Sequence, residues 1–203
     1  MRVSVFDYGA GNLHSLMRAL ELHGAQARRV EDPRDALDAD ALVLPGVGAF
    51  ATAARRLAPA RAAMRDALER GLPCLGVCLG MQLLFEASEE GDGDGLGLLS
   101  GRVTRLAARR VPHMGWNDVR WVDARDPLRG PGDLALGYFA NGYACRPRDG
   151  SCVAAWCEHD GDRFPAVVRH ARTLGVQFHP EKSGREGLAL VGAFLAGVEA
   201  AAR

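Results

Sequence analysis

The chain has 203 residues, of which 48% are hydrophobic and 25% are charged, and its 25 basic and 25 acidic side chains leave no net formal charge. This composition excludes a disordered or fibrous chain, and the neutrality argues against a nucleic-acid or anionic-membrane partner. At roughly 150 residues per domain, we expect one domain spanning residues 1–203. No apolar run of about 18 residues and no signal-peptide core occurs, so we expect a cytoplasmic protein.

The first ninety residues or so alternate short apolar runs with helical patterns. The expected strands are Arg2–Phe6, Ala41–Leu44 and Cys74–Val77, and the expected helices cover residues 13–23, 59–70 and 79–87. Asn12 is expected to cap the first helix, and Gly24 to end it. Strands that alternate with helices predict βαβ units and a mostly parallel sheet.

From about residue 98 the pattern changes to successive strand-like runs. These runs cover residues 98–106, 118–122, 135–143, 153–158, 164–170 and 173–178, and a helix is expected over residues 187–202. Asp160-Gly161 indicates a hairpin turn, and residues 112–117 are expected to form a loop. The sequence therefore predicts an α/β fold with a central, mostly parallel sheet flanked by helices and an antiparallel strand extension.

The five cysteines are an odd number without a C-x-x-C pair, which fits neither a disulfide framework nor a zinc site. We therefore expect no metal, no other cofactor and at least one free thiol. The cysteines are Cys74, Cys78, Cys145, Cys152 and Cys157.

One cysteine lies in Gly76-Val77-Cys78-Leu79-Gly80, between an expected strand and an expected helix. This is the cysteine version of a nucleophile elbow, a turn so sharp that its flanking residues must be small. The following helix contributes its dipole and unpaired N–H groups beside the sulfur. Cys78 is therefore the candidate nucleophile, and the other cysteines are expected to be buried structural thiols.

A thiolate nucleophile needs a base and a group that orients the base. Among six histidines, His179 directly follows an apolar strand, at the carboxyl edge where open α/β sheets place their sites. Glu181 lies two residues further on, and its carboxylate can fold back onto the imidazole. These residues predict a Cys78, His179 and Glu181 triad.

An oxyanion formed at Cys78 needs backbone N–H donors. Leu79 begins the helix after the nucleophile, and Val47 lies between glycines in Pro45-Gly46-Val47-Gly48, so both are candidate donors. The spacing of these glycines also imitates a dinucleotide fingerprint. We discount NAD binding because no acidic residue ends a following strand at the required distance.

The motifs around Cys78 and His179 together resemble those of class I glutamine amidotransferases. Within that class, Pro45-Gly46-Val47-Gly48 and Pro112-His113-Met114-Gly115-Trp116-Asn117 resemble the glutaminase subunits of imidazole glycerol phosphate synthase, and the similarity covers nearly the whole chain. The resemblance implies a class I amidotransferase fold, L-glutamine as substrate, and hydrolysis to glutamate and ammonia through a Cys78 thioester. It also implies that Gln82 and Gly46 help to bind glutamine.

Free ammonia becomes ammonium in water at neutral pH, so this chemistry requires a protected route to an acceptor. The family's partner is a separate (β/α)8-barrel cyclase that uses the ammonia in histidine biosynthesis. By resemblance, four positions lie near that partner: Asn12, Met114, Trp116 and Lys182, the last being the single lysine of the chain. One stretch differs from the family, since Asn141-Gly142 stands where a His-Ser or His-Thr pair is usual.

Three alternatives remain open at this point. The chain could be the glutaminase of another amidotransferase, for anthranilate or pyridoxal phosphate synthesis. It could be a non-catalytic interaction module that keeps the fold, or a free-standing cysteine hydrolase that needs no second protein.

Overall fold

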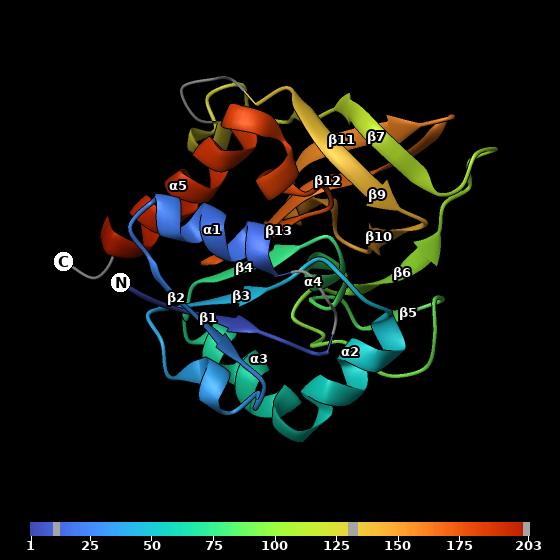
Figure 1. Ribbon diagram of the computed structural model, residues 1–203. Helices are drawn as coiled ribbons and strands as arrows, with labels where there is room; N and C mark the ends of the chain where they lie inside the picture. Colours follow the sequence, from blue (N-terminus) through green and yellow to red (C-terminus); the bar gives the residue numbers. More distant parts are fainter. Residues whose placement is uncertain (10–12, 130–133, 201–203) are drawn as a thin grey trace.

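The computed structural model describes residues 1–9, 13–129 and 134–200, and a large mixed sheet runs through this part of the chain. Over the described residues the sheet has eight strands in the order β2-β1-β3-β4-β13-β12-β11-β8 (Figure 1). The first five are parallel, and the last three continue the sheet in antiparallel fashion. Their bounds are β1 Arg2–Phe6, β2 Gln26–Val30, β3 Ala41–Leu44, β4 Cys74–Val77, β8 Arg120–Trp121, β11 Val153–His159, β12 Asp162–His170 and β13 Thr173–Val176.

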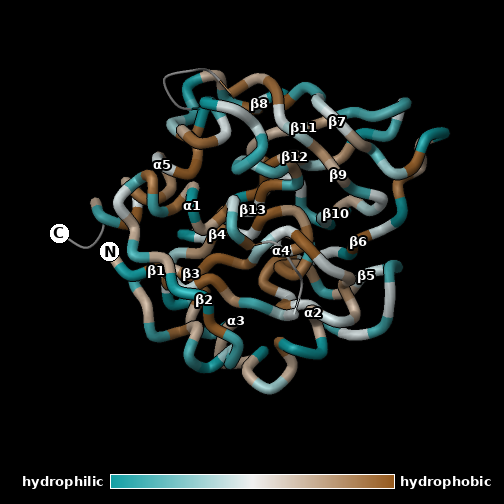
Figure 2. The backbone as a smooth tube through the Cα atoms, viewed as in Figure 1, coloured by the Kyte–Doolittle hydropathy of each residue, from teal (hydrophilic) through white to brown (hydrophobic). Residues whose placement is uncertain are grey.

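Helices cover both faces of this sheet (Figure 1). On one face lie α1 (His14–Leu22) and α5 (Gly184–Ala200), and on the other lie α2 (Phe50–Leu57) and α3 (Arg61–Glu69). Side chains of a strand alternate between its two faces, so Val43 packs with α1 and α5 while Leu42 and Leu44 pack with α2 and α3. Buried on both faces, the central strands are almost entirely apolar (Figure 2).

Two smaller sheets lie beside the antiparallel end of the main sheet. One pairs β7 (His113–Asp118) with β9 (Leu136–Asn141). The other has the order β10-β6-β5, from β10 (Tyr143–Pro147), β6 (Gly101–Arg105) and β5 (Ala87–Ser88). Within the described ranges, no helix is long and apolar enough to cross a membrane.

The predicted fold class is confirmed, and the predicted hairpin at Asp160-Gly161 joins β11 to β12 with both residues at positive φ, 50° and 87°. Several elements were not predicted, among them β2, β5 and α2. Strand β2 lies at the edge of the sheet and is half exposed, so it lacks an apolar run. Helix α2 does have the apolar spacing of an amphipathic helix, at Phe50, Ala53, Ala54 and Leu57.

Several predicted boundaries are wrong. The N-cap position of α1 is Leu13 rather than Asn12, which lies outside the described residues. Pro59 belongs to a 3-10 turn that precedes α3. The predicted strand over residues 135–143 divides at Gly142, and the final helix begins at Gly184 rather than Gly187.

Two corrections concern segments near the candidate site. The helix after Cys78, α4 (Leu79–Gln82), is much shorter than predicted. The carbonyls of Leu83 and Phe85 accept hydrogen bonds from Leu96 and Gly97, so the chain turns away instead of continuing the helix. Residues 113–117, predicted as part of a loop, form strand β7 together with Asp118. Its exposed positions include Met114 and Trp116, and its less exposed positions are His113, Gly115 and Asn117, so the usual alternation of apolar inward and polar outward residues is reversed.

Candidate active site

Three parallel strands end side by side where the candidate residues lie. In the register, Gly76 of β4 is opposite both Leu44 of β3 and Gly175 of β13. The next residues along the chain are therefore brought together: Cys78 after β4, the loop from Pro45 after β3, and His179 shortly after β13. The backbone N–H of Cys78 donates to the carbonyl of Val176 at 2.6 Å, which fixes β4 to β13 at this point.

Cys78 has the strained backbone of a nucleophile elbow, with φ 45° and ψ −102°. The turn is possible only because glycines flank it. A Cβ atom on Gly76 would lie 2.7 Å from the carbonyl oxygen of Gly80, and one on Gly80 would overlap the carbonyl of Leu44. The sequence motif thus has a direct steric reason.

His179 is buried and its Nδ1 lies 2.8 Å from Oε1 of Glu181, whose side chain is also buried. Burial alone lowers the pKa of His179, but hydrogen bonds to Cys78 and Glu181, together with the negative charge of both, raise that pKa to about 9. The raised pKa favours the cationic form of the imidazole, which lies between the Cys78 sulfur and the Glu181 carboxyl group. This arrangement can transfer a proton to a leaving group.

The loop after β3 packs directly against this pair. A Cβ atom on Gly46 would lie 2.9 Å from Cε1 of His179 and 3.1 Å from Cβ of Cys78, so only glycine fits there. The buried Tyr8 hydroxyl donates to the carbonyl of Pro45 and holds the start of the loop. Val47 is partly buried next in the chain. Leu79 is the first residue of α4, where an N–H has no partner within its own helix.

Gln82 is buried one turn beyond the nucleophile and is joined to two groups. Its Nε2 donates to the carbonyl of Tyr143 at 3.2 Å and to Oε1 of Gln177 at 3.3 Å. Asn141, at the position that differs from the family, donates to the same Tyr143 carbonyl at 3.0 Å. Gly142 leaves room for a side chain, since a Cβ there would meet only Val111 at 3.6 Å.

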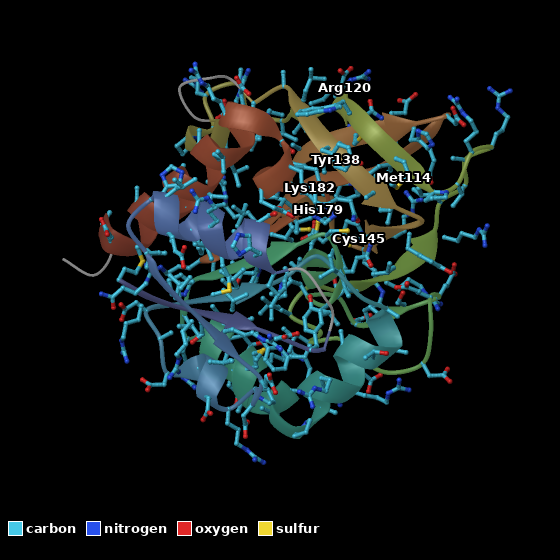
Figure 3. All side chains as sticks on the ribbon, viewed as in Figure 1. Met114, Arg120, Tyr138, Cys145, His179 and Lys182 are labelled. Atoms are coloured by element: carbon cyan, nitrogen blue, oxygen red, sulfur yellow. The ribbon has the colours of Figure 1, made fainter. Side chains whose placement is uncertain are left out.

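Three predicted partner-facing residues are exposed: Met114, Trp116 and Lys182. Met114 and Lys182 lie in the same part of the view as His179 in Figure 3. Met114 and Trp116 of β7 are 60% and 56% exposed, and Lys182 follows the triad loop. Trp116 lies 6.2 Å from the Tyr138 ring and Lys182 Nζ lies 6.0 Å from it. We use the name β7–β9 surface for four exposed residues: Met114 and Trp116 of β7, Leu136 of β9, and Lys182.

Sequence reasoning missed three buried residues at the site: Tyr8, Gln177 and Ser183. Ser183 accepts from the N–H of Tyr138 at 2.9 Å and donates to the carbonyl of His179 at 2.7 Å, and Gln177 Nε2 donates to Cys78 Sγ at 3.4 Å. A polar residue inside an apolar strand was the available signal for Gln177, because a buried amide must be hydrogen-bonded. Only the fold reveals the contacts of the other two.

The remaining four cysteines differ from Cys78 in their chemistry. Burial raises the pKa of Cys74, Cys145 and Cys152, and that of Cys157 to about 12. A raised pKa keeps a thiol protonated and unreactive near neutral pH. Cys74, Cys145 and Cys157 are buried as predicted, whereas Cys152 is only partly buried.

The family defined as Glutamine amidotransferase class-I matches residues 4–196 of the chain. Among curated relatives, the imidazole glycerol phosphate synthase subunit HisH of Moorella thermoacetica is 45% identical over 191 residues, which are 92% of this chain and 90% of that protein. The HisH subunit of Halobacterium salinarum is 44% identical over 202 residues, 95% of this chain and 92% of that protein.

Solved structures agree on the fold. A crystal structure of a glutamine amidotransferase has a TM-score of 0.76 at 24% identity and covers 97% of this chain and 98% of its own. PurLQS from Thermotoga maritima has the same TM-score at 22% identity, with the same coverage. The chain belongs to the class I glutamine amidotransferases. Within that family it is close to the HisH subunits of imidazole glycerol phosphate synthase.

Proposed function

We propose that the chain is the glutaminase subunit of an imidazole glycerol phosphate synthase, acting as one domain over residues 1–203 in the cytoplasm. Cys78, His179 and Glu181 are its catalytic triad. The observation that carries this proposal is the buried contact of His179 with both Cys78 and Glu181 at the ends of adjacent strands.

In the first half of the reaction, the Cys78 thiolate attacks the side-chain carboxamide carbon of L-glutamine. The backbone N–H groups of Val47 and Leu79 stabilise the oxyanion that forms. The His179 imidazolium gives its proton to the departing nitrogen, so ammonia leaves as the C–N bond breaks. The glutamyl group is then joined to the sulfur of Cys78 through a thioester bond.

In the second half, neutral His179 takes a proton from water as the water attacks the thioester. The C–S bond breaks, the electron pair returns to sulfur and glutamate is released. Glu181 keeps the imidazole in one tautomer throughout, through its 2.8 Å contact with Nδ1.

Gln82 and Gly46 help to bind the substrate. Because Nε2 of Gln82 is engaged by Tyr143 and Gln177, its Oε1 is the atom that accepts a hydrogen bond from the glutamine ammonium group. Gly46 lets the oxyanion loop lie directly against His179 and Cys78, with no side chain to block the substrate.

The acceptor of the ammonia is a cyclase subunit with a (β/α)8-barrel fold, which makes imidazole glycerol phosphate. Its docking site is the β7–β9 surface, where exposed aromatic, apolar and cationic groups lie beside the triad loop. An exposed tryptophan in such a setting is typical of an interaction hot spot. Asn12 completes the proposed contact, although it lies outside the described residues.

The test is to purify the chain with its cyclase and to measure glutamate release from glutamine. We expect Cys78→Ala to abolish release, with Cys152→Ala as the matched control that leaves it intact. Glutaminase activity that survives Cys78→Ala contradicts the assigned nucleophile. Failure of the cyclase to bind contradicts the assigned partner.

A further inference from the structure

A chain of buried amides ends at the sulfur of Cys78. Gln82 donates from Nε2 to the Tyr143 carbonyl and to Oε1 of Gln177, and Gln177 donates from Nε2 to Cys78 Sγ at 3.4 Å. The triad mechanism uses neither of these last two contacts. They connect the nucleophile to the backbone of β10, on the side of the fold that carries no triad residue.

The hydrogen bond from Gln82 to the Tyr143 carbonyl determines the direction of the other hydrogen bonds in this series of amides. A backbone carbonyl can only accept, so Gln82 must turn its NH2 group toward Tyr143. The same nitrogen reaches Gln177, which must therefore present its oxygen. The NH2 group of Gln177 is then left facing the sulfur. Flipping the Gln82 amide would oppose its oxygen to the Tyr143 carbonyl, and flipping the Gln177 amide alone would oppose two NH2 groups.

Gln177 has no freedom to turn away from this contact. Its side chain is fully buried, and its backbone N–H donates to the carbonyl of Ala166 at 2.9 Å. The pairing of Val176 with Val77 sets the next residue of each strand, Gln177 and Cys78, side by side. The donor is thus in place before any substrate arrives.

We propose that Gln177 is a catalytic residue whose amide N–H donates a hydrogen bond to the Cys78 sulfur whenever that sulfur carries negative charge. A hydrogen bond to the charged form of an acid favours that form, so the contact stabilises the thiolate over the thiol before attack. The sulfur of a thioester carries no such charge. The donor acts again when the C–S bond breaks and the electron pair returns to sulfur.

Gln82 acts through Gln177 and is a positioning residue in this respect. Its NH2 group holds Oε1 of Gln177 and so aims the other end of that amide at Cys78. If the amide of Gln82 is removed by substitution, the NH2 group of Gln177 is still present beside Cys78 but is no longer held in one orientation.

The inference rests on Cys78 being the nucleophile of the proposed function, so its test reads the thiol itself and not glutamine hydrolysis. The full chain is alkylated with iodoacetamide between about pH 5 and 10, and the Cys78 peptide is quantified by mass spectrometry. We expect the midpoint of the rate profile to rise by about one pH unit in Gln177→Met. Gln177→Glu raises it further because its carboxylate faces the sulfur, and Gln82→Met raises it less.

Two matched controls separate this effect from a general disturbance. Thr173→Val changes a buried polar residue of the same strand, and Gln26→Glu makes the same chemical change on an exposed strand. Both should keep the wild-type midpoint. Thermal unfolding of each variant establishes that it is folded. If Gln177→Met does not fold, Gln177→Glu is the variant that tests the proposal, because it keeps the shape of the side chain and the acceptor for Gln82.

An unmoved midpoint in a folded Gln177 variant overturns the proposal, as does an equal shift in Thr173→Val. With the cyclase present, Gln177→Met should also lower kcat while KM changes little. If the wild-type complex has no glutaminase activity, the proposed function fails, but the alkylation profile still decides the role of Gln177.

Discussion

The carboxyl ends of strands β4 and β13, which carry Cys78 and His179, differ sharply in packing from the neighbouring β7–β9 surface. At these strand ends, hypothetical Cβ atoms on Gly46, Gly76 and Gly80 all meet other atoms within 3 Å, and the reactive side chains are buried. On the β7–β9 surface, Met114 and Trp116 are more than half exposed. The first region has almost no space for an added atom, whereas the exposed side chains of the second can be substituted without steric conflict. Substitutions in the first should alter folding or chemistry, and those in the second should alter assembly alone.

The largest expected effect comes from Gly80→Ala. Its methyl group would overlap the carbonyl of Leu44, and backbone cannot yield as a flexible side chain can. We expect the free energy of unfolding to fall by about 3 kcal/mol or more, measured by denaturant unfolding. Gly197→Ala is the control, because an exposed helical glycine with open space around it should gain up to about 1 kcal/mol. Equal stability of the two variants would remove the steric account of the elbow.

A smaller effect, on assembly, is expected from Trp116→Ala. Loss of a hot-spot aromatic should weaken cyclase binding by about 2 kcal/mol, roughly 30-fold in Kd. Titration calorimetry measures this change. The stability of the isolated chain and the alkylation of Cys78 should stay as in the wild type, because the indole is more than half exposed and its ring packs against Tyr138. A large loss of stability would mean that the two regions are not as different as the exposed fractions indicate.

A pH effect is expected from Glu181→Gln. The carboxylate contributes to the raised pKa of His179, about 9, so its removal lowers that pKa. Since imidazolium must protonate the leaving ammonia, the alkaline limb of the kcat profile should move down by about one pH unit or more. Activity should therefore fall more at pH 8.5 than at pH 6.5, and an alkaline limb that stays in place would count against the role of Glu181.

The smallest expected effect concerns backbone strain at Cys78. Alanine is normally no worse than glycine in a folded chain, but at φ 45° and ψ −102° only glycine is unstrained. Cys78→Gly should therefore be more stable than Cys78→Ala by about 1 kcal/mol. Thermal unfolding of the two inactive variants compares them directly, and the reverse order would show that the elbow stores no strain.

The same contrast explains how much the sequence could predict. The elbow and the segment His179-Pro180-Glu181 are local patterns with a steric or chemical reason, so the residues of the proposed triad could be named without the fold. The hydrogen bonds of Tyr8 to Pro45 and of Tyr138 to Ser183 join residues 37 and 45 positions apart in the chain, and no local pattern encodes them. The sequence predicts a loop at β7 because the exposed positions of this strand carry Met114 and Trp116 while its less exposed positions carry His113, Gly115 and Asn117, the reverse of the pattern expected for a half-buried strand.

The hydroxyl of Ser183 links the two regions at one point, as it accepts from Tyr138 of β9 and donates to the carbonyl of His179. The N–H of His179 in turn donates to the carbonyl of Tyr138 at 2.8 Å. These three hydrogen bonds close a small ring that joins His179, the proposed proton carrier, to the strand that pairs with the exposed Trp116. Three hydrogen bonds thus attach the loop to the strand, so the proposed partner subunit, on docking at the strand, meets a histidine whose distance from the docking surface is set by the fold.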